Sequence, residues 1–309
     1  MTSRFKAEVT TTVRRMAAKI LGDYQPPVLQ HAPELLQQLD AAGARDGVDG
    51  EWATFTRDIA AALRANGADR FLRLPPIAKT VHPRIRSHTR RYLDYLLQSP
   101  RFSLSLSKAL TESPVGQPLL NPQYPLSSPL LMQHGYHLVR LLEATDLDLT
   151  TLRLVVDFGA GYGSFFRLLR NMGYQQRYVI CDLPVMCALQ RFYLRNVFPT
   201  EPDAQPPANL QWAADEIPAT LRREAAQHSP SLFIATWSLS ETPLSVRHEI
   251  TPALDAFSYI LCAYQRTFGS RNNVEYFEAL QKSMPQFDWQ HFECPVYRNN
   301  FYLIGRRQA

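Results

Sequence analysis

A short apolar run that leads into a glycine-rich turn is the feature that most constrains the fold of this chain. Residues 154–158 read Leu-Val-Val-Asp-Phe, and glycines follow at alternate positions, Gly159, Gly161 and Gly163. Residues 164–169 then have the apolar spacing of an amphipathic helix. Glycine lets the backbone turn tightly and approach a ligand where a Cβ would collide. The segment predicts a β-strand, a ligand-binding turn and a helix that begins at the ligand.

Acidic residues flank this turn and distinguish it from a dinucleotide-binding turn. Asp157 precedes the first glycine, and a second apolar run, Tyr178 to Cys181, ends in Asp182. An acid after the second strand is placed where ribose hydroxyls bind. The third glycine comes two residues after the second, not three, so the turn departs from the pattern that admits a pyrophosphate. An acid beside the turn favours a cofactor with an ammonium and a sulfonium group.

The first strand, the D-F-G-A-G-Y-G run and the downstream acid resemble the first two cofactor motifs of the class I S-adenosylmethionine-dependent methyltransferases. The resemblance implies an α/β fold: a Rossmann-like, doubly wound seven-stranded sheet with a C-terminal antiparallel hairpin. It also implies S-adenosyl-L-methionine as the cofactor. Asp157 would lie near the methionine amino group and the three glycines against the methionine and ribose. Asp182, followed by Leu183, would bind the ribose hydroxyls.

A third motif of that family has a counterpart in residues 210–218, Leu-Gln-Trp-Ala-Ala-Asp-Glu-Ile-Pro. This run resembles the strand whose end presents an acid or amide to the adenine amino group, and Asp215, followed by Glu216, is the matching position. The alternative is a plain parallel-sheet core with turn glycines and solvated acids.

Alternation of strands and helices extends over the C-terminal part of the chain. Strands are expected near residues 153–157, 177–181, 209–213, 231–236 and 258–263, with helices between them, and a terminal hairpin over 288–296 and 301–306. Helices are expected over 8–21, 33–42, 51–65, 85–98 and 130–144. Five prolines between Ser113 and Leu130 mark a linker or an ordered covering loop. We therefore expect an N-terminal helical cap and linker, residues 1–128, and a methyltransferase domain, residues 129–309.

Composition is typical of an enzyme with a large core, because 45% of the 309 residues are hydrophobic. The sequence has no apolar stretch long enough to span a bilayer and no signal-peptide pattern at its start, so we expect a cytoplasmic protein without a membrane partner. The four cysteines form no C-x-x-C pair and are expected to be buried thiols. Assembly as a homodimer is left open.

Basic residues are concentrated in one stretch. Between Arg70 and Lys108 there are nine basic side chains and one acid, Asp94. Such a stretch attracts nucleic acid, an acidic membrane surface or an anionic substrate, or is the solvated face of a helix. Because no RNA-module signature accompanies the charge, we expect no nucleic-acid partner.

The end of the fourth predicted strand carries candidate acceptor-binding residues. The apolar run 232–235 leads into a polar cluster that includes Trp237, Ser238, Ser240 and Glu241. Methyl transfer to a hydroxyl requires removal of its proton, so Glu241 is a candidate base, or it binds a cationic acceptor. The structural alternative makes Glu241 a helix N-cap or first-turn acid, with Pro243 fixing the turn.

Other candidate site residues lie outside this run. His134 is a second candidate base, with a satisfied core or surface histidine as its alternative. Tyr297, Arg298 and Asn300, at the expected hairpin tip, are candidate acceptor ligands; the alternative is an exposed turn. Aromatic residues expected near loops, among them Tyr162, Phe165 and Tyr302, suggest contact with the acceptor. Because clustered carboxylates are lacking near the fourth strand, we expect no metal.

Two stretches narrow the resemblance. Asp182 to Leu194, with D-L-P and L-Q-R-F-Y-L, and the T-W-S-L-S-E run resemble bacterial proteins described as sugar O-methyltransferases. The resemblance implies O-methylation of a sugar or other hydroxylated small molecule. N-methylation of an amino acid or guanidine-like metabolite is the enzymatic alternative. A nucleic-acid or partner-binding module that kept the fold without catalysis is the alternative outside enzymes.

Overall fold

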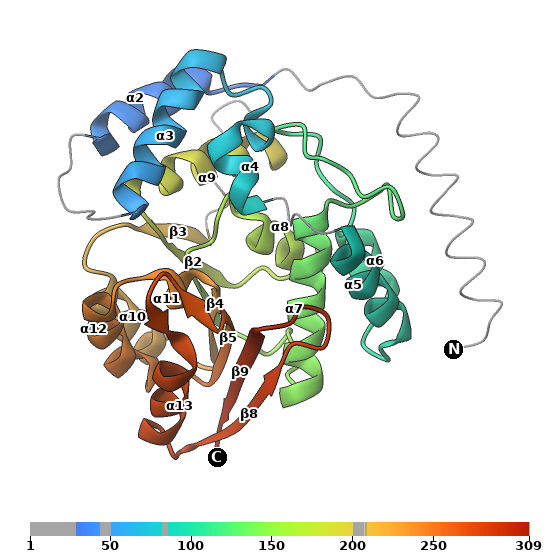
Figure 1. Cartoon of the computed structure of the whole chain (residues 1–309), viewed down its shortest axis with the longest axis vertical. Coiled ribbons are helices and arrows are strands. Elements are labelled where there is room, and N and C mark those ends of the chain that lie inside the picture. Colours follow the sequence, from blue (N-terminus) through green and yellow to red (C-terminus); the bar gives the residue numbers. More distant parts are fainter. Residues whose placement is uncertain (1–28, 44–50, 82–85, 200–206, 208, 309) are drawn as a thin grey trace. The chain divides into compact units, whose positions relative to one another are not determined.

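A computed structural model of the chain describes residues 29–43, 51–81, 86–199, 207 and 209–308 (Figure 1). The expected helix over 8–21 lies outside these residues. The chain forms two compact units. The helical unit comprises residues up to Val139, Gly161–Gly173 and Pro184–Pro206; the sheet unit comprises Arg140–Ala160, Tyr174–Leu183 and the residues from Pro207 onward. Each unit is described by itself.

A seven-stranded sheet forms the centre of the sheet unit, with strand order β3-β2-β1-β4-β5-β9-β8 (Figure 1). Its strands are β1 (Leu154–Phe158), β2 (Arg177–Cys181), β3 (Leu210–Ala213), β4 (Ser231–Thr236), β5 (Tyr259–Gln265), β8 (Phe287–Glu293) and β9 (Asn300–Arg307). Neighbours from β3 to β5 pair in parallel, whereas β9 is antiparallel to both β5 and β8. This is the Rossmann-like methyltransferase fold, as predicted, including the C-terminal antiparallel pair.

Burial explains why the inner strands read as continuous apolar runs. Every residue of β1 is buried, and so are the first five of β4, because parallel strands are covered on both faces.

The sheet unit also contains α10 (Ile217–Gln227), α11 (Ser238–Glu241), α12 (Leu244–Leu254), α13 (Asn273–Ser283) and the short pair β6 (Thr267–Phe268) and β7 (Arg271–Asn272). The two edge strands of the seven-stranded sheet are β3, which has four residues, and β8, in which Asp288, Gln290 and Glu293 are exposed.

Helices make up the helical unit. They are α2 (Ala32–Gly43), α3 (Glu51–Asn66), the 3₁₀ helix η1 (Phe71–Arg73), α4 (Pro75–Val81), α5 (Arg86–Gln98), α6 (Leu104–Ala109), α8 (Ser164–Asn171) and α9 (Pro184–Val197). A further helix, α7 (Pro129–Thr145), begins in this unit. The expected helices over 33–42, 51–65, 85–98 and 130–144 are confirmed within one residue of their predicted ends. The short helices α4 and α6 were not expected from the sequence.

Burial agrees with two expectations from the sequence, the basic face of a helix and the buried cysteines. On α5, Arg90 and Arg91 are exposed while Tyr92 and Leu96 are buried, which is the arrangement of an amphipathic helix with a solvated basic face. All four cysteines are buried free thiols, as predicted. No helix in the described ranges is long and apolar enough to cross a membrane.

The proline-rich segment is an ordered loop of the helical unit. It buries Val115, Tyr124 and Leu126, which are 3%, 5% and 7% exposed. Hydrogen bonds hold it together, including one from the Asn121 backbone N–H to the Ser127 carbonyl, 2.8 Å long. Of the two interpretations of the prolines, a linker or an ordered covering loop, the burial agrees with the ordered loop.

Candidate active site

The carboxyl ends of the first three strands are tied together in the sheet unit. The Gly159 N–H, just after β1, donates to the Cys181 carbonyl at the end of β2 over 2.8 Å. The Asp182 N–H donates to the Ala213 carbonyl at the end of β3 over 3.1 Å. The strand ends that carry Asp157, Asp182 and Asp215 therefore form one edge, which is where open α/β sheets bind ligands.

Asp157 is a buried carboxyl group with one strong donor. It is 2% exposed, and its Oδ2 accepts a 2.8 Å hydrogen bond from the Tyr178 hydroxyl on β2. Burial raises the pKa of Asp157 to about 7, although the hydrogen bond from Tyr178 acts in the opposite direction. A cation that approached this carboxyl group would favour its ionised form.

Gly159 is required by close packing at the same edge. Its φ is +72°, and a Cβ there would collide with the side chain of Ser238. Ser238, the first residue of α11, donates from its hydroxyl to the Phe158 carbonyl. The turn after β1 and the turn after β4 are therefore in direct contact, so the predicted acceptor residue Ser238 lies beside the first glycine.

Gly161 and Gly163 belong to the helical unit. At Gly161 the φ is +59°, and apart from its two chain neighbours no atom of the described residues lies within 4 Å of where a Cβ would be. The Gly161 carbonyl accepts a 2.8 Å hydrogen bond from the Gln190 side chain of α9. Gly163 is the N-cap of α8 with φ +92°. The turn is thus held from the α9 side and leaves space at its middle glycine.

The other cofactor candidates follow β2 and β3. Asp182 is half-buried, and its Oδ1 accepts from the Leu183 backbone N–H over 2.8 Å. Asp215 and Glu216 are exposed, and Glu216 is the N-cap of α10 with φ +50°. The structure places both predicted acids of the second and third motifs at the carboxyl edge of the sheet.

The residues after β4 form a polar network with β5 and β9. The Trp237 indole N–H donates to the Asn300 side-chain oxygen over 2.7 Å. The Ser240 hydroxyl donates to the Gln265 side-chain oxygen over 2.9 Å, and the Gln265 amide donates to Glu241 Oε1 over 3.1 Å. Because Gln265 and Asn300 are partners in the β5–β9 ladder, the four predicted residues and Gln265 form one cluster.

Backbone geometry at this cluster is unusual. Trp237 has φ +65°, a region that non-glycine residues seldom occupy and that is concentrated at functional sites. Glu241 lies in the single turn of α11, while Pro243 is the N-cap of the next helix, α12. The structural alternative for Glu241 thus agrees with the structure in giving it a helical first turn. Pro243 does not fix that turn, because it lies after α11 as the N-cap of α12.

A buried arginine holds this turn in place. Arg247 of α12 is fully buried and donates to the Ser240 carbonyl, to the Thr242 carbonyl over 3.0 Å and to the Asn273 side chain over 2.9 Å. The Asn273 amide in turn donates to the Gln265 carbonyl over 2.9 Å. These contacts fix the segment that carries Glu241.

The segment before β9 lies at the same edge, as expected. The β8 strand is antiparallel to β9, which is antiparallel to β5, so β8 ends on the side where β5 ends. Tyr297 is half-buried and Arg298 is exposed, while Asn299 has φ +59°. The hydrogen bond from Trp237 to Asn300 brings the end of this segment to the cluster after β4.

His134 lies in the helical unit and is 6% exposed. Its Nδ1 and the Ser164 hydroxyl share a 2.8 Å hydrogen bond. Burial, with a smaller contribution from Arg167, lowers the pKa of His134 to about 3. A neutral, satisfied imidazole of this kind accepts a proton poorly near neutral pH, which favours the alternative of a core histidine.

Three of the aromatic residues that were expected near loops, as contacts of the acceptor, are buried in the structure. Tyr162, Phe165 and Tyr302 are 2%, 2% and 1% exposed and pack in the core. Tyr162, in the middle of the glycine turn, makes edge contacts with Phe71 and Tyr193, with ring centroids 6.3 Å and 4.8 Å away. All three rings are therefore part of the packed interior, and the ring of Tyr162 anchors the glycine turn.

Three residues of the site were not found from the sequence: Tyr178, Gln265 and Arg247. Tyr178 and Asp157 occupy the same face of neighbouring parallel strands, since Tyr178 pairs with Val155. That relation could have been read from the alternation of side chains once the register was known. No group of three or more His, Cys, Asp or Glu side chains in the described residues could hold a metal ion.

No protein-family model and no curated protein matches the sequence. Among solved structures, the methyltransferase domain of bacterial CtHen1 is 8% identical, with a TM-score of 0.41, and the match covers 57% of this chain and 97% of that one. A SAM-dependent methyltransferase from Anabaena variabilis is 10% identical, with a TM-score of 0.37, covering 55% and 84%. The N-methyltransferase NodS from Bradyrhizobium japonicum is 10% identical, with a TM-score of 0.37, covering 58% and 88%. Because these scores are low, the fold is identified by the strand order of the chain itself.

Proposed function

We propose that the protein transfers a methyl group from S-adenosylmethionine to a small-molecule acceptor. The observation that carries the proposal is a pair of carboxyl groups at the ends of neighbouring parallel strands: Asp157 lies near the end of β1, and Asp182 directly follows β2. Asp157 suits a methionine ammonium group and Asp182 suits ribose hydroxyls. When bound, the cofactor would supply an electrophilic methyl group.

The polar cluster after β4 supports a hydroxylated acceptor, such as a sugar. Trp237, Ser240, Gln265 and Asn300 offer donors and acceptors of hydrogen bonds, and Glu241 offers a carboxylate. In this proposal Glu241 takes the proton of the acceptor hydroxyl, and the surrounding side chains orient the acceptor. Tyr297 and Arg298 are proposed to border the acceptor at the same edge.

Calorimetric titration with S-adenosylmethionine and S-adenosylhomocysteine tests the cofactor. We expect micromolar binding, about 8 kcal/mol, by the wild-type protein and loss of binding by Asp182→Ala. Glu249→Ala, which removes an exposed acid of α12 in the same unit, is the control for general effects of substitution. Absence of binding by the folded wild-type protein would refute the proposal.

N-methylation remains the second candidate, because the Glu241 carboxylate is equally suited to a cationic nitrogen. A panel of sugars and amines, assayed by release of S-adenosylhomocysteine, separates the two. With a hydroxyl acceptor, Glu241→Gln should lower kcat because the base is lost. With a cationic acceptor it should chiefly raise KM. A non-catalytic binding module would instead keep its function in Asp157→Ala.

A further inference from the structure

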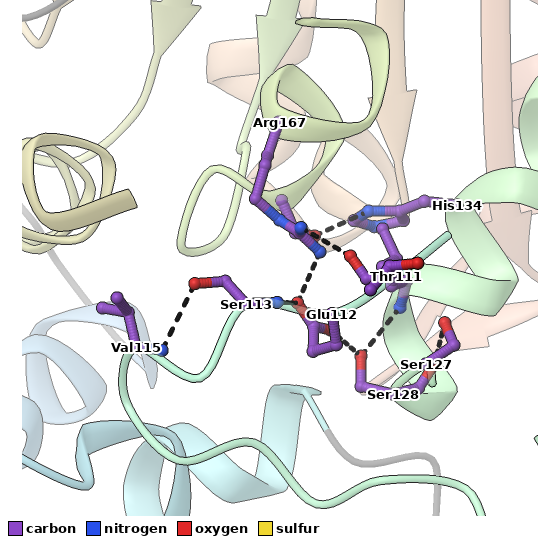
Figure 2. A network of polar contacts seen from close by, with 10 residues as sticks. Thr111, Glu112, Ser113, Val115, Ser127, Ser128, His134 and Arg167 are labelled. Carbon is purple, nitrogen blue, oxygen red and sulfur yellow. Dashed lines mark hydrogen bonds and ion pairs between the residues drawn. The ribbon is translucent and has the colours of Figure 1, made fainter. Parts of the chain in front are cut away.

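A buried ion pair joins the proline-rich loop to the helix that follows the glycine turn (Figure 2). Arg167 Nη2 of α8 lies 2.5 Å from Glu112 Oε1, and the two side chains are 3% and 2% exposed. Arg167 also donates to the Thr111 carbonyl over 2.8 Å. All of these residues belong to the helical unit.

Glu112 is tied to the loop at both of its oxygens. Oε1 accepts from the Ser113 backbone N–H over 2.9 Å, and Oε2 accepts from the Ser128 hydroxyl (Figure 2). The Ser128 hydroxyl also accepts from the Leu131 N–H in the first turn of α7, over 3.2 Å. The carboxylate thus connects the two ends of the proline-rich loop with α8.

Arg167 lies in the first turn of α8, and its backbone N–H donates to the Gly163 carbonyl over 3.2 Å. On the other side of Gly163, the Tyr162 ring is buried against Phe71 and Tyr193. The stretch from Gly161 to Arg167 is therefore held by side chains from the N-terminal part of the chain at two places.

A buried ion pair contributes little net stability, because desolvation of both charges offsets their attraction, but removal of one partner leaves the other charge uncompensated. Such a pair is suited to holding the two segments that it joins in one arrangement, and it adds little to the free energy of unfolding. We propose that Glu112 is a positioning residue: through Arg167 it fixes the start of α8 and the second half of the glycine turn in the shape that binds S-adenosylmethionine. This inference rests on the proposed function, and it gives the proline-rich loop a role in cofactor binding.

The test compares Glu112→Gln with Glu224→Gln. Glu224 is also a 2% exposed carboxylate paired with an arginine, Arg177, but it lies in the sheet unit and outside the candidate site. For each folded variant we would measure backbone amide exchange over 161–167 without ligand, and S-adenosylhomocysteine affinity by calorimetry. We expect Glu112→Gln to exchange faster there and to bind roughly tenfold more weakly. Glu224→Gln should change neither property.

Equal affinity and exchange in Glu112→Gln and the wild type would overturn the inference, as would an equal loss of affinity in Glu224→Gln. A double variant, Glu112→Met with Arg167→Met, removes both charges while keeping the volume apolar. Relative to Glu112→Gln, we expect the double variant to regain free energy of unfolding but not S-adenosylhomocysteine affinity. Recovery of both would also overturn the inference. If the wild type binds no S-adenosylhomocysteine, the proposed function fails, while the exchange data still report whether Glu112 holds the turn.

Discussion

At the scale of single residues, two buried titratable groups change charge in opposite ways. The pKa of Asp157 is raised to about 7, chiefly by burial, so its carboxyl group gains a proton on folding in mildly acidic solution. The pKa of His134 is lowered to about 3, also chiefly by burial, so its imidazole loses a proton on folding. We therefore expect Asp157 to make cofactor affinity depend on pH and His134 to make the free energy of unfolding depend on pH.

Asp157 predicts that cofactor affinity rises with pH. As the pH increases through about 7, the carboxyl group becomes the anion that attracts an ammonium group. We expect S-adenosylmethionine affinity to be roughly tenfold higher at about pH 8 than at about pH 6. Titrations at several pH values measure this. Tyr178→Phe removes a hydrogen bond that lowers the pKa, so it should move the rise to higher pH.

Asp157→Asn is the control for that prediction, because an amide does not titrate in this range. Its binding should be weak and its affinity should not follow the wild-type rise. A wild-type affinity that stays flat over the same range would contradict a role for Asp157 in binding the ammonium group.

His134 predicts a loss of stability in acid. Its folded pKa of about 3 lies below the unfolded value of 6.5, so the folded state gains stability above pH 6.5 and loses it as the pH falls toward 3. Urea unfolding at several pH values should show a shallower acid loss in His134→Gln than in the wild type. His248→Gln, at an exposed position, should leave the slope unchanged. An unchanged slope in His134→Gln would argue against the buried neutral imidazole.

At the scale of elements, the turn after β4 depends on one side chain from α12. Arg247 satisfies two carbonyls of the α11 segment and the Asn273 side chain. We expect Arg247→Met to lower the free energy of unfolding by about 3 kcal/mol, since these buried acceptors lose their donor. Urea denaturation measures the change. Arg223→Met, at a side chain that is 53% exposed, should cost far less, and comparable losses in both variants would contradict this role.

Elements with long, regular patterns could be predicted from the sequence, and contacts between elements could not. The strands β1, β2 and β4 follow from apolar runs, and α2, α3 and α5 from helical spacing. Short elements such as α4, α6 and the β6–β7 pair lack enough residues for a period. The hydrogen bond from Gln265 to Glu241 forms because the end of β5 lies beside the turn after β4. The pattern of apolar and polar residues within each segment does not predict this contact between them.

At the scale of the whole molecule, the chain passes repeatedly between its two units. The helices α8 and α9, which follow β1 and β2, group with the N-terminal helices: α2 and α3 contact α9, and α6 contacts α8. The sequence gives no sign of this grouping, because each helix reads locally as part of an ordinary alternation with strands.

This grouping predicts the behaviour of a fragment that begins at the expected domain boundary. Residues 129–309 alone would leave Tyr162 without Phe71 and Arg167 without Glu112. We expect the fragment to aggregate or to bind a dye for exposed apolar surface, whereas the full chain unfolds cooperatively. Circular dichroism and dye fluorescence compare the two. A fragment that unfolds cooperatively would establish residues 129–309 as an independent domain.

The edge strands β3 and β8 limit how two copies of the protein can associate. A long, flat, apolar edge strand pairs readily with the edge of another chain and leads to aggregation. Here β3 offers only four residues, and β8 presents the polar side chains of Asp288, Gln290 and Glu293. Continuation of the sheet from one molecule into the next is therefore disfavoured at both ends, and any self-association is expected to use helices or loops.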